Sequence, residues 1–402
     1  MEECITYCKA NPGEGGCNQL RERYEKGLHP ENQGQRPRSQ MEAKDLNRVF
    51  SGGNCQGTGN VNFTHSPMND EDISFIQPLG LMVGEHVTPI DHLYLNPIDI
   101  NSPRDAYGVY AIANATIVSI QHRLQDAYSG RPFTDEYRLV FEHSCTLYSY
   151  YDLLTSLSPG ILSQVQFQGL YSNTRLRVTA GELIGKIGGQ TLDFSVFNQG
   201  VNLTGFVNQA SYDSEPWKIH VDNPFPYFVE PIRSTLLSKL LRTSPPRWGK
   251  IDYDIDGRLA GNWFLNATKG YGALGANHPS RGHLSLSYDY LDPTQVRVSL
   301  GDFPGIGSTQ FGVAGNAPDP ATISTSSGLV KYTLVQFAYH GADGQQWNDH
   351  TAFASGITAK GIDNQPQGTA LLQLLDNRTL KAEFFKQTGV TNFDENAKIY
   401  VR

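Results

Sequence analysis

Three side chains that commonly bind zinc, those of His86, Asp91 and His92, lie within seven residues of the chain. Imidazole nitrogens and carboxylate oxygens are typical ligands of hydrolytic Zn²⁺ sites, where about three protein ligands leave one position open for water and a nearby group handles the proton. His143 and Asp193 offer the same chemistry further along the chain. One hypothesis is therefore a metal site that uses His86, one of Asp91 and His92, His143 and Asp193.

The alternative is that the same residues are structural. An alternating strand over residues 91–95 would direct Asp91 to one face and His92 to the other, so the two side chains would not share a face. Histidines 86 and 92 would then be buried and hydrogen bonded to the backbone, next to a proline-bearing turn. We favour this structural interpretation of the stretch.

A glycine-rich run is the main element expected to position such a site. It reads Val178-Thr-Ala-Gly-Glu-Leu-Ile-Gly-Lys-Ile-Gly-Gly189, and Thr191-Leu-Asp-Phe-Ser-Val196 follows almost at once. Apolar residues alternating with glycines are expected in short strands of a small barrel, where the backbone bends sharply and approaches a neighbour closely. The run resembles the segment that closes the catalytic core of lysostaphin-like zinc endopeptidases, which cut peptidoglycan.

Three upstream segments resemble the same family, in the family's order: residues 99–118, 137–143 and 146–154. The resemblance covers about residues 90–197. It implies a small antiparallel β core, the duplicated hybrid motif of that family, with strands at 109–120, 137–143, 147–151 and 192–197 around one groove. It assigns the metal-binding aspartate of the family to Asp99.

The resemblance also implies that the family's chemistry is incomplete in this chain. The zinc ligands of the family are a histidine, an aspartate four residues later, and the second histidine of His-x-His. These positions are Leu95, Asp99 and Asp193 here, and Thr191 and Tyr150 stand where the family has its two assisting histidines. Two carboxylates alone make a poor zinc site. The resemblance therefore implies a degenerate member without catalytic residues or a cofactor.

Two functions remain open. The first is a non-catalytic binding or structural protein outside the cytoplasm, which recognises a cell-wall or surface glycan or a protein partner through a groove where Asp99, His143 and Asp193 lie near one another. The second is a divergent zinc-dependent hydrolase of peptidoglycan or peptide with the relocated metal site. Because enzymes that lose several cooperating catalytic groups lose most of their activity, the missing ligands favour the first.

Composition narrows the class of protein further. A chain of 402 residues is long enough for two domains. The net charge of −8, without a strong basic cluster, argues against nucleic acid as a main partner. No apolar run is long enough for a transmembrane helix. The 40 glycines, many tyrosines and phenylalanines and short alternating stretches indicate a mostly β protein.

The compartment is expected to be secreted or cell-surface, although no signal peptide is visible at Met1. Five Asn-x-Thr sequons are compatible with this location: Asn62, Asn114, Asn202, Asn266 and Asn377. Three of the five cysteines, Cys4, Cys8 and Cys17, cluster near the start, and Cys55 and Cys145 stand alone. Disulfides, free thiols and a terminal metal knuckle are all open, and we rank the metal last.

The pattern of polarity predicts four parts. Residues 1–70 form a polar arm with short helices near 21–26 and 41–50, and 71–232 form the lysostaphin-like β domain. Residues 233–249 hold a helix, expected over 231–242 with a packed leucine face, and a linker. Residues 250–402 form a second β domain, a barrel or a sandwich. In it, Gly261-Asn-Trp263 resembles the opening strand of lipocalins, although one tripeptide does not fix the class.

Overall fold

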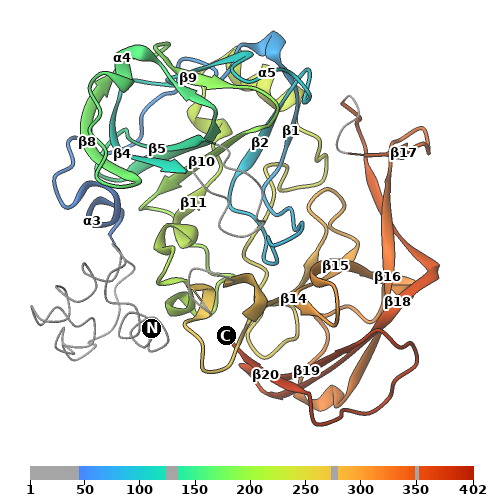
Figure 1. Ribbon diagram of the computed structural model, residues 1–402. Helices are drawn as coiled ribbons and strands as arrows, with labels where there is room; N and C mark the ends of the chain where they lie inside the picture. The colour runs from blue at the N-terminus through green and yellow to red at the C-terminus, as the bar shows by residue number, and fades with distance from the viewer. Residues whose placement is uncertain (1–44, 124–134, 273–278, 349–352) are drawn as a thin grey trace, which may run out of the picture. The chain divides into compact units, whose positions relative to one another are not determined.

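The computed structural model describes residues 45–123, 135–272, 279–348 and 353–402, and the described residues belong to one compact unit. Strands dominate this unit, as the composition predicts (Figure 1). The α-helices are short: α3 (Leu46–Ser51), α4 (Pro159–Leu162) and α5 (Ile232–Ser238). Single 3₁₀ turns connect other elements: η2 (Asp70–Asp72), η3 (Gln209–Tyr212), η4 (Pro216–His220), η5 (Phe225–Tyr227), η6 (Gly270–Gly272), η7 (Pro279–Gly282), η8 (Ala314–Asn316) and η9 (Thr325–Ser327).

The first β region is built on an antiparallel sheet in the order β1-β2-β10-β6-β5-β4-β8, with β11 paired to β10. Its strands are β1 (Ile73–Gln77), β2 (Leu93–Pro97), β4 (Ala115–Arg123), β5 (Glu136–Glu142), β6 (Leu147–Leu154), β8 (Tyr171–Val178), β10 (Leu192–Asn198) and β11 (Val221–Asp222). A smaller sheet contains β3 (Tyr107–Tyr110), β9 (Leu183–Ile187) and β7 (Ser156–Leu157), in the order β3-β9-β7.

The predicted antiparallel core is therefore present. Strands β4, β5, β6 and β10 are consecutive neighbours in one sheet and correspond to the four predicted segments. The prediction was wrong at Val109, which belongs to β3 in the smaller sheet, because the chain turns at residues 111–114 before β4 begins. The glycine-rich run behaves as its pattern predicts: Gly181 has a positive φ of 81° in a turn, and Gly185 on β9 abuts the backbone of Ser156.

Two predicted helices can be compared with the structure. The one near 41–50 corresponds to α3, and the one near 21–26 lies outside the described residues. The helix expected over 231–242 is shorter, because α5 ends at Ser238 and the backbone of Ile76 on β1 then bonds to Lys239 and Leu241. The leucine face packs as predicted, with Leu236, Leu240 and Leu241 buried.

The second β region is a closed antiparallel barrel. Its strands are β12 (Gly261–Leu265), β13 (His283–Tyr288), β14 (Val296–Phe303), β15 (Gly307–Val313), β16 (Val330–His340), β18 (Thr358–Asp376), β19 (Thr379–Phe385) and β20 (Lys398–Val401). Each strand pairs with the next in the sequence, and β20 pairs back to β12, which removes every free edge. A short strand, β17 (Gln346–Trp347), pairs with β16. Of the two predicted architectures, the barrel is therefore correct.

One end of the barrel is sealed by Trp263 and Arg402. Trp263 is fully buried, and its indole nitrogen donates to the carbonyl of Leu259. The guanidinium of Arg402 lies 4.1 Å from the centre of the Trp263 ring, and it donates to the carbonyls of Ala260 and Ile255. The last residue of the chain is thus fastened to the segment that leads into the first barrel strand.

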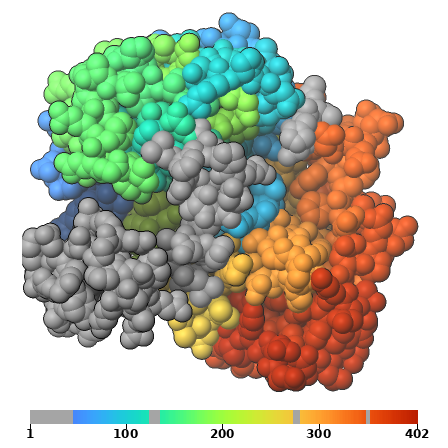
Figure 2. All heavy atoms as spheres, in the orientation of Figure 1, coloured from blue at the N-terminus to red at the C-terminus, as the bar shows by residue number. Residues whose placement is uncertain are grey.

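The two β regions also contact one another directly. A small apolar cluster joins Phe75 of β1 to Tyr290, Trp347 and Ile357 of the second region. In the space-filling view, the barrel residues form the continuous orange and red surface (Figure 2).

No helix in the described part of the chain combines the length and apolar character needed to cross a membrane.

A disulfide between Cys55 and Cys145 fastens the segment after α3 to the turn between β5 and β6. The backbone of the same turn adds to this attachment, since the Cys145 amide donates to the Gly57 carbonyl. The cysteines 4, 8 and 17 lie outside the described residues.

We expect the Cys55→Ser/Cys145→Ser variant to lose about 2–4 kcal/mol of stability, because the cross-link restricts a long loop of the unfolded chain. The urea unfolding midpoints of the variant and the unreduced wild type measure this loss. Addition of reductant should lower the wild-type midpoint and leave the variant unchanged. Peptide mapping that finds Cys55 bonded to a cysteine other than Cys145 would contradict the assignment.

Candidate functional site

Sheet register brings residues from four separate segments to one buried place. On β10, Asp193 lies opposite Tyr94 of β2 on one side and Asp152 of β6 on the other. Asp91 and His92 lie in the bend that leads into β2. Tyr150 reaches the same place from β6 and Lys218 from η4. We call Asp91, His92, Tyr150, Asp193 and Lys218 the ion-pair cluster.

His92 is at the centre of the ion-pair cluster. Its Nδ1 lies 2.6 Å from the hydroxyl of Tyr150 and 3.2 Å from Asp91 Oδ1. Its Nε2 lies 3.1 Å from Asp193 Oδ2, as an ion pair rather than a well-aligned hydrogen bond. Both ring nitrogens therefore face oxygen atoms.

Lys218 supplies the second positive charge. Its ammonium lies 2.9 Å from Asp91 Oδ2 and 3.2 Å from Glu215 Oε2, and it sits 4.7 Å from the ring centre of Tyr271. Only 5% of Lys218 is exposed, and Asp91 is equally buried. Because a buried charge without a partner is costly, Asp91 and Lys218 depend on each other.

These contacts shift the pKa values of the cluster. Burial alone would lower the pKa of His92, but the attraction of Asp193 and Asp91 outweighs it and raises the pKa to about 9. Burial opposes ionisation of Asp91, yet the neighbouring Lys218 and His92 hold its pKa well below its ordinary value. At neutral pH the cluster thus contains an imidazolium, an ammonium and the Asp91 carboxylate.

A small cavity of about 80 Å³ opens beside the cluster. Besides cluster residues, its lining includes His86, which is exposed, together with Arg138, Trp217 and Tyr271. The Arg138 guanidinium lies 5.3 Å from the ring centre of Tyr150, and its Nη2 lies 2.5 Å from Asp152 Oδ2. The cavity can therefore accommodate one small polar group.

This arrangement does not fit the zinc ion that the hydrolase hypothesis requires. Zinc binds a neutral imidazole nitrogen and free carboxylate oxygens, and it must displace protons to do so. Here the imidazole of His92 is held protonated between two aspartates, and Lys218 already pairs with Asp91. Among the described residues, no group of three or more His, Cys, Asp and Glu side chains is arranged to hold a metal ion.

The predicted site residues are only partly brought together. Asp91, His92 and Asp193 converge, and His86 lies at the cavity beside them. The expectation that Asp91 and His92 point apart was wrong, because both residues precede β2, where the alternation of a strand does not apply.

Asp99 and His143 take no part in the ion-pair cluster. Asp99 is exposed in the turn after β2, where its carboxylate accepts the amide of Asn101. His143 Nε2 lies 2.8 Å from the hydroxyl of Ser149, its ring packs against Phe63, and burial lowers its pKa to about 4. The expected proximity of Asp99, His143 and Asp193 is therefore not found, and a neutral His143 is held by a hydroxyl instead of a carboxylate.

Sequence reasoning missed Lys218, Glu215, Arg138 and Tyr271. The one local signal was that Lys218 stands between two large apolar residues, Trp217 and Ile219. An exposed lysine is uncommon in such a setting, so the pattern indicates a buried one. Its partner Asp91 is more than a hundred residues away, so no spacing rule connects the two.

Comparisons with known proteins do not establish a family for this chain. No family model and no curated protein matches this chain. A solved structure of Helicobacter pylori Csd3 is similar over 42% of this chain and 35% of its own length, with 13% identity and a TM-score of 0.25. The solution structure of lysostaphin is similar over 84% of this chain and 90% of its own, with 11% identity and a TM-score of 0.26. At these values the likeness supports no statement about fold class or activity, and the aligned part is about a third of the Csd3 chain.

We expect Lys218→Met to destabilise the protein by about 3–5 kcal/mol, because it leaves the buried Asp91 carboxylate without its ammonium partner. The matched control is Lys398→Met, which removes an exposed ion pair to Asp302 and should cost at most about 1 kcal/mol. Urea unfolding at pH 7 measures both values. Equal losses in the two variants would show that the cluster is no more important than a surface ion pair.

The raised pKa of His92 predicts a loss of stability in alkaline solution. The unfolded chain releases this proton near pH 6.5 and the folded chain near 9, so the stabilisation is complete below pH 6.5 and is lost as the pH rises through 9. The expected loss is about 3 kcal/mol. His92→Gln should be less stable at pH 7 and should lack this alkaline slope. An identical slope in both proteins would refute the assignment.

Proposed function

We propose that this chain is a non-catalytic binding protein that acts outside the cytoplasm, on a scaffold resembling that of lysostaphin-like peptidases. The main support is the ion-pair cluster. At the position that the resemblance gives to a zinc-binding histidine, the chain has Asp193, and the charge opposite it comes from His92. Two protonated side chains, His92 and Lys218, take the place of a divalent cation among the carboxylates.

The same contacts argue against a role of these residues in hydrolysis. A general base must have a free lone pair near neutral pH, and His92 is held as an imidazolium. Tyr150 cannot replace it, since burial and the nearby carboxylates raise its pKa well above 10. The neutral ring of His143 lies at a different place, against Phe63 and Ser149. The cluster is thus suited to hold the scaffold together, and recognition is left to the surface.

The proposed location rests on two features. A disulfide such as Cys55–Cys145 persists mainly in oxidising compartments. The asparagines of all five sequons are exposed: Asn62, Asn114, Asn202, Asn266 and Asn377. An extracytoplasmic protein of this kind would meet cell-wall or surface glycans, which we propose as its partner class, with a protein partner as the other outcome.

Metal analysis tests the proposal. Protein purified without a chelator should carry well below one equivalent of zinc, and Asp99→Ala, an exposed position, should change stability by less than about 1 kcal/mol. The protein should bind without cleaving: incubation with purified peptidoglycan should release no soluble fragments, with or without added zinc.

The hydrolase alternative predicts the opposite results. Stoichiometric zinc that a chelator removes, together with cleavage that chelation abolishes, would overturn the proposal. His143→Ala is the informative variant, because it should leave binding unchanged in a non-catalytic protein and should abolish cleavage in a hydrolase that uses this residue.

A further inference from the structure

The open end of the barrel contains a much larger cavity than the one beside the ion-pair cluster, about 490 Å³ against about 80 Å³. It lies where the β14–β15 turn and the β19–β20 connection leave the barrel, at the end away from Trp263 and Arg402. Clefts that hold small ligands have volumes of about 300–1,000 Å³. We call this cavity the mouth groove.

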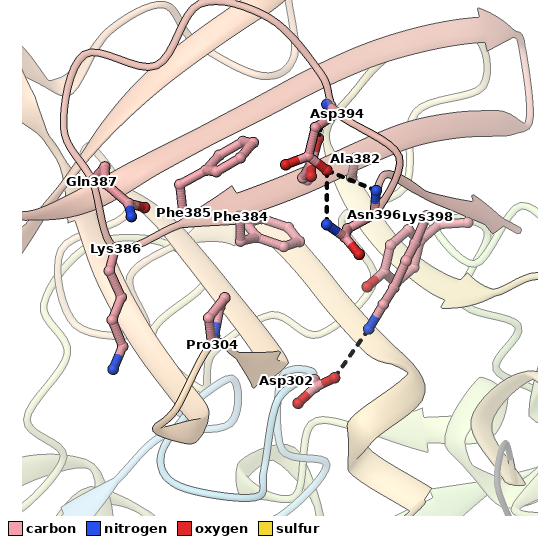
Figure 3. A pocket seen from close by; sticks show the side chains of 12 residues that line it. Asp302, Pro304, Ala382, Phe384, Phe385, Lys386, Gln387, Asp394, Asn396 and Lys398 are labelled. Carbon is pink, nitrogen blue, oxygen red and sulfur yellow. Dashed lines mark hydrogen bonds and ion pairs between the residues drawn. The ribbon is translucent and has the colours of Figure 1, made fainter.

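The floor of the mouth groove is apolar and its rims are polar. Ala382 and Tyr400 belong to the barrel core, and the partly exposed ring of Phe384 packs against that core (Figure 3). Asp302 and Pro304 form one rim. The other rim contains Lys386, Gln387, Asp394, Asn396 and Lys398.

Several rim side chains are already held in place. The Lys398 ammonium lies 3.0 Å from Asp302 Oδ2, across the groove. The carboxylate of Asp394 accepts from the backbone and side-chain nitrogens of Asn396. Fixed polar groups bind a ligand with a smaller loss of entropy than mobile ones.

The two rims also approach each other at Gly305. A Cβ atom at this position would lie 2.6 Å from Lys386 Nζ, and the φ of +68° also favours glycine. The Lys386 ammonium therefore lies directly against the β14–β15 turn. In the described part of the chain it has no carboxylate within ion-pair distance, which leaves its donors to solvent or to a ligand.

This combination selects among ligand classes. A fatty acid could pair its carboxylate with Lys386, but its apolar chain would desolvate the carboxylates of Asp302, Glu383 and Asp394 without giving them partners, which is unfavourable. A polyphosphate or nucleic acid would meet the carboxylates of Asp302, Glu383 and Asp394. A neutral sugar ring instead offers apolar C–H faces to Phe384 and hydroxyl groups that both donate to carboxylates and accept from ammonium and amide groups.

We propose that the mouth groove binds a neutral saccharide of about disaccharide size. One sugar ring stacks on Phe384, and the hydroxyl groups of the saccharide form hydrogen bonds with Asp302, Asp394 and Lys398. This binding does not depend on whether the first β region is catalytic, because none of its residues line the groove.

Isothermal titration calorimetry of the full chain tests the proposal with three disaccharides, N,N′-diacetylchitobiose, cellobiose and maltose, each up to about 10 mM, and with sodium laurate. At least one disaccharide should bind with one site per chain, and laurate should not compete with it. Lys398→Met should weaken the saccharide about tenfold, through loss of one charge-assisted hydrogen bond and of the partner that holds Asp302. Phe384→Ala should weaken it at least as much.

Controls separate the groove from the rest of the molecule. Lys331→Met makes the same change at an exposed position of β16, outside the groove, and should bind saccharide like the wild type. Phe384 packs against the barrel core, so Phe384→Ala could fail to fold. In that case the saccharide affinity of Lys398→Met, which changes only an exposed ion pair, tests the proposal. No saccharide binding, binding unaffected by Lys398→Met, or displacement by laurate would each overturn the proposal. None of these outcomes bears on zinc or cleavage, which test the proposed function.

Discussion

The first β region is organised around charges that are buried and can be stable only together. Asp91 and Lys218 are each almost fully enclosed, and His92 lies between Asp91 and Asp193. Removing a single partner leaves an uncompensated charge that is almost completely buried. This requirement fixes where the bend before β2 must lie relative to β6, β10 and η4, because the bend contributes Asp91 and His92 and each of the other elements contributes one member.

The same requirement gives the carboxylates of this region positive partners that come from the chain itself. A zinc ion would neutralise carboxylates and cross-link the strands that carry them. Here an imidazolium and an ammonium provide the positive charge, and the strands are joined through their side chains. The barrel does not depend on these charges. Pairing of β12 with β20 closes its sheet, the Trp263–Arg402 contact seals one end, and the other end is open.

Much of the fold could be predicted from local patterns. The resemblance of short segments to the family implied the strands that correspond to β5, β6 and β10, and the alternation of glycines with apolar residues indicated the short strand β9. The helix after residue 231 was predicted too long, since the pairing of Ile76 with Leu241 that ends it comes from a distant strand. The site was harder to predict. Asp193 was identified through the resemblance, but its contact with His92 depends on strand register. The ion pair between Asp91 and Lys218 joins the bend before β2 to η4, more than a hundred residues further along the chain.

The protonation state of His92 tests the central claim most directly. Nitrogen-15 NMR of histidine-labelled protein, assigned with the His92→Gln variant, reports whether each ring nitrogen carries a proton. The account predicts that both nitrogens of His92 are protonated at pH 7.5, that the ring titrates with a pKa near 9, and that added zinc leaves its signals unchanged. A neutral His92 at pH 7.5 whose ring signals shift on addition of one equivalent of zinc would contradict it, and would restore this cluster as a metal site.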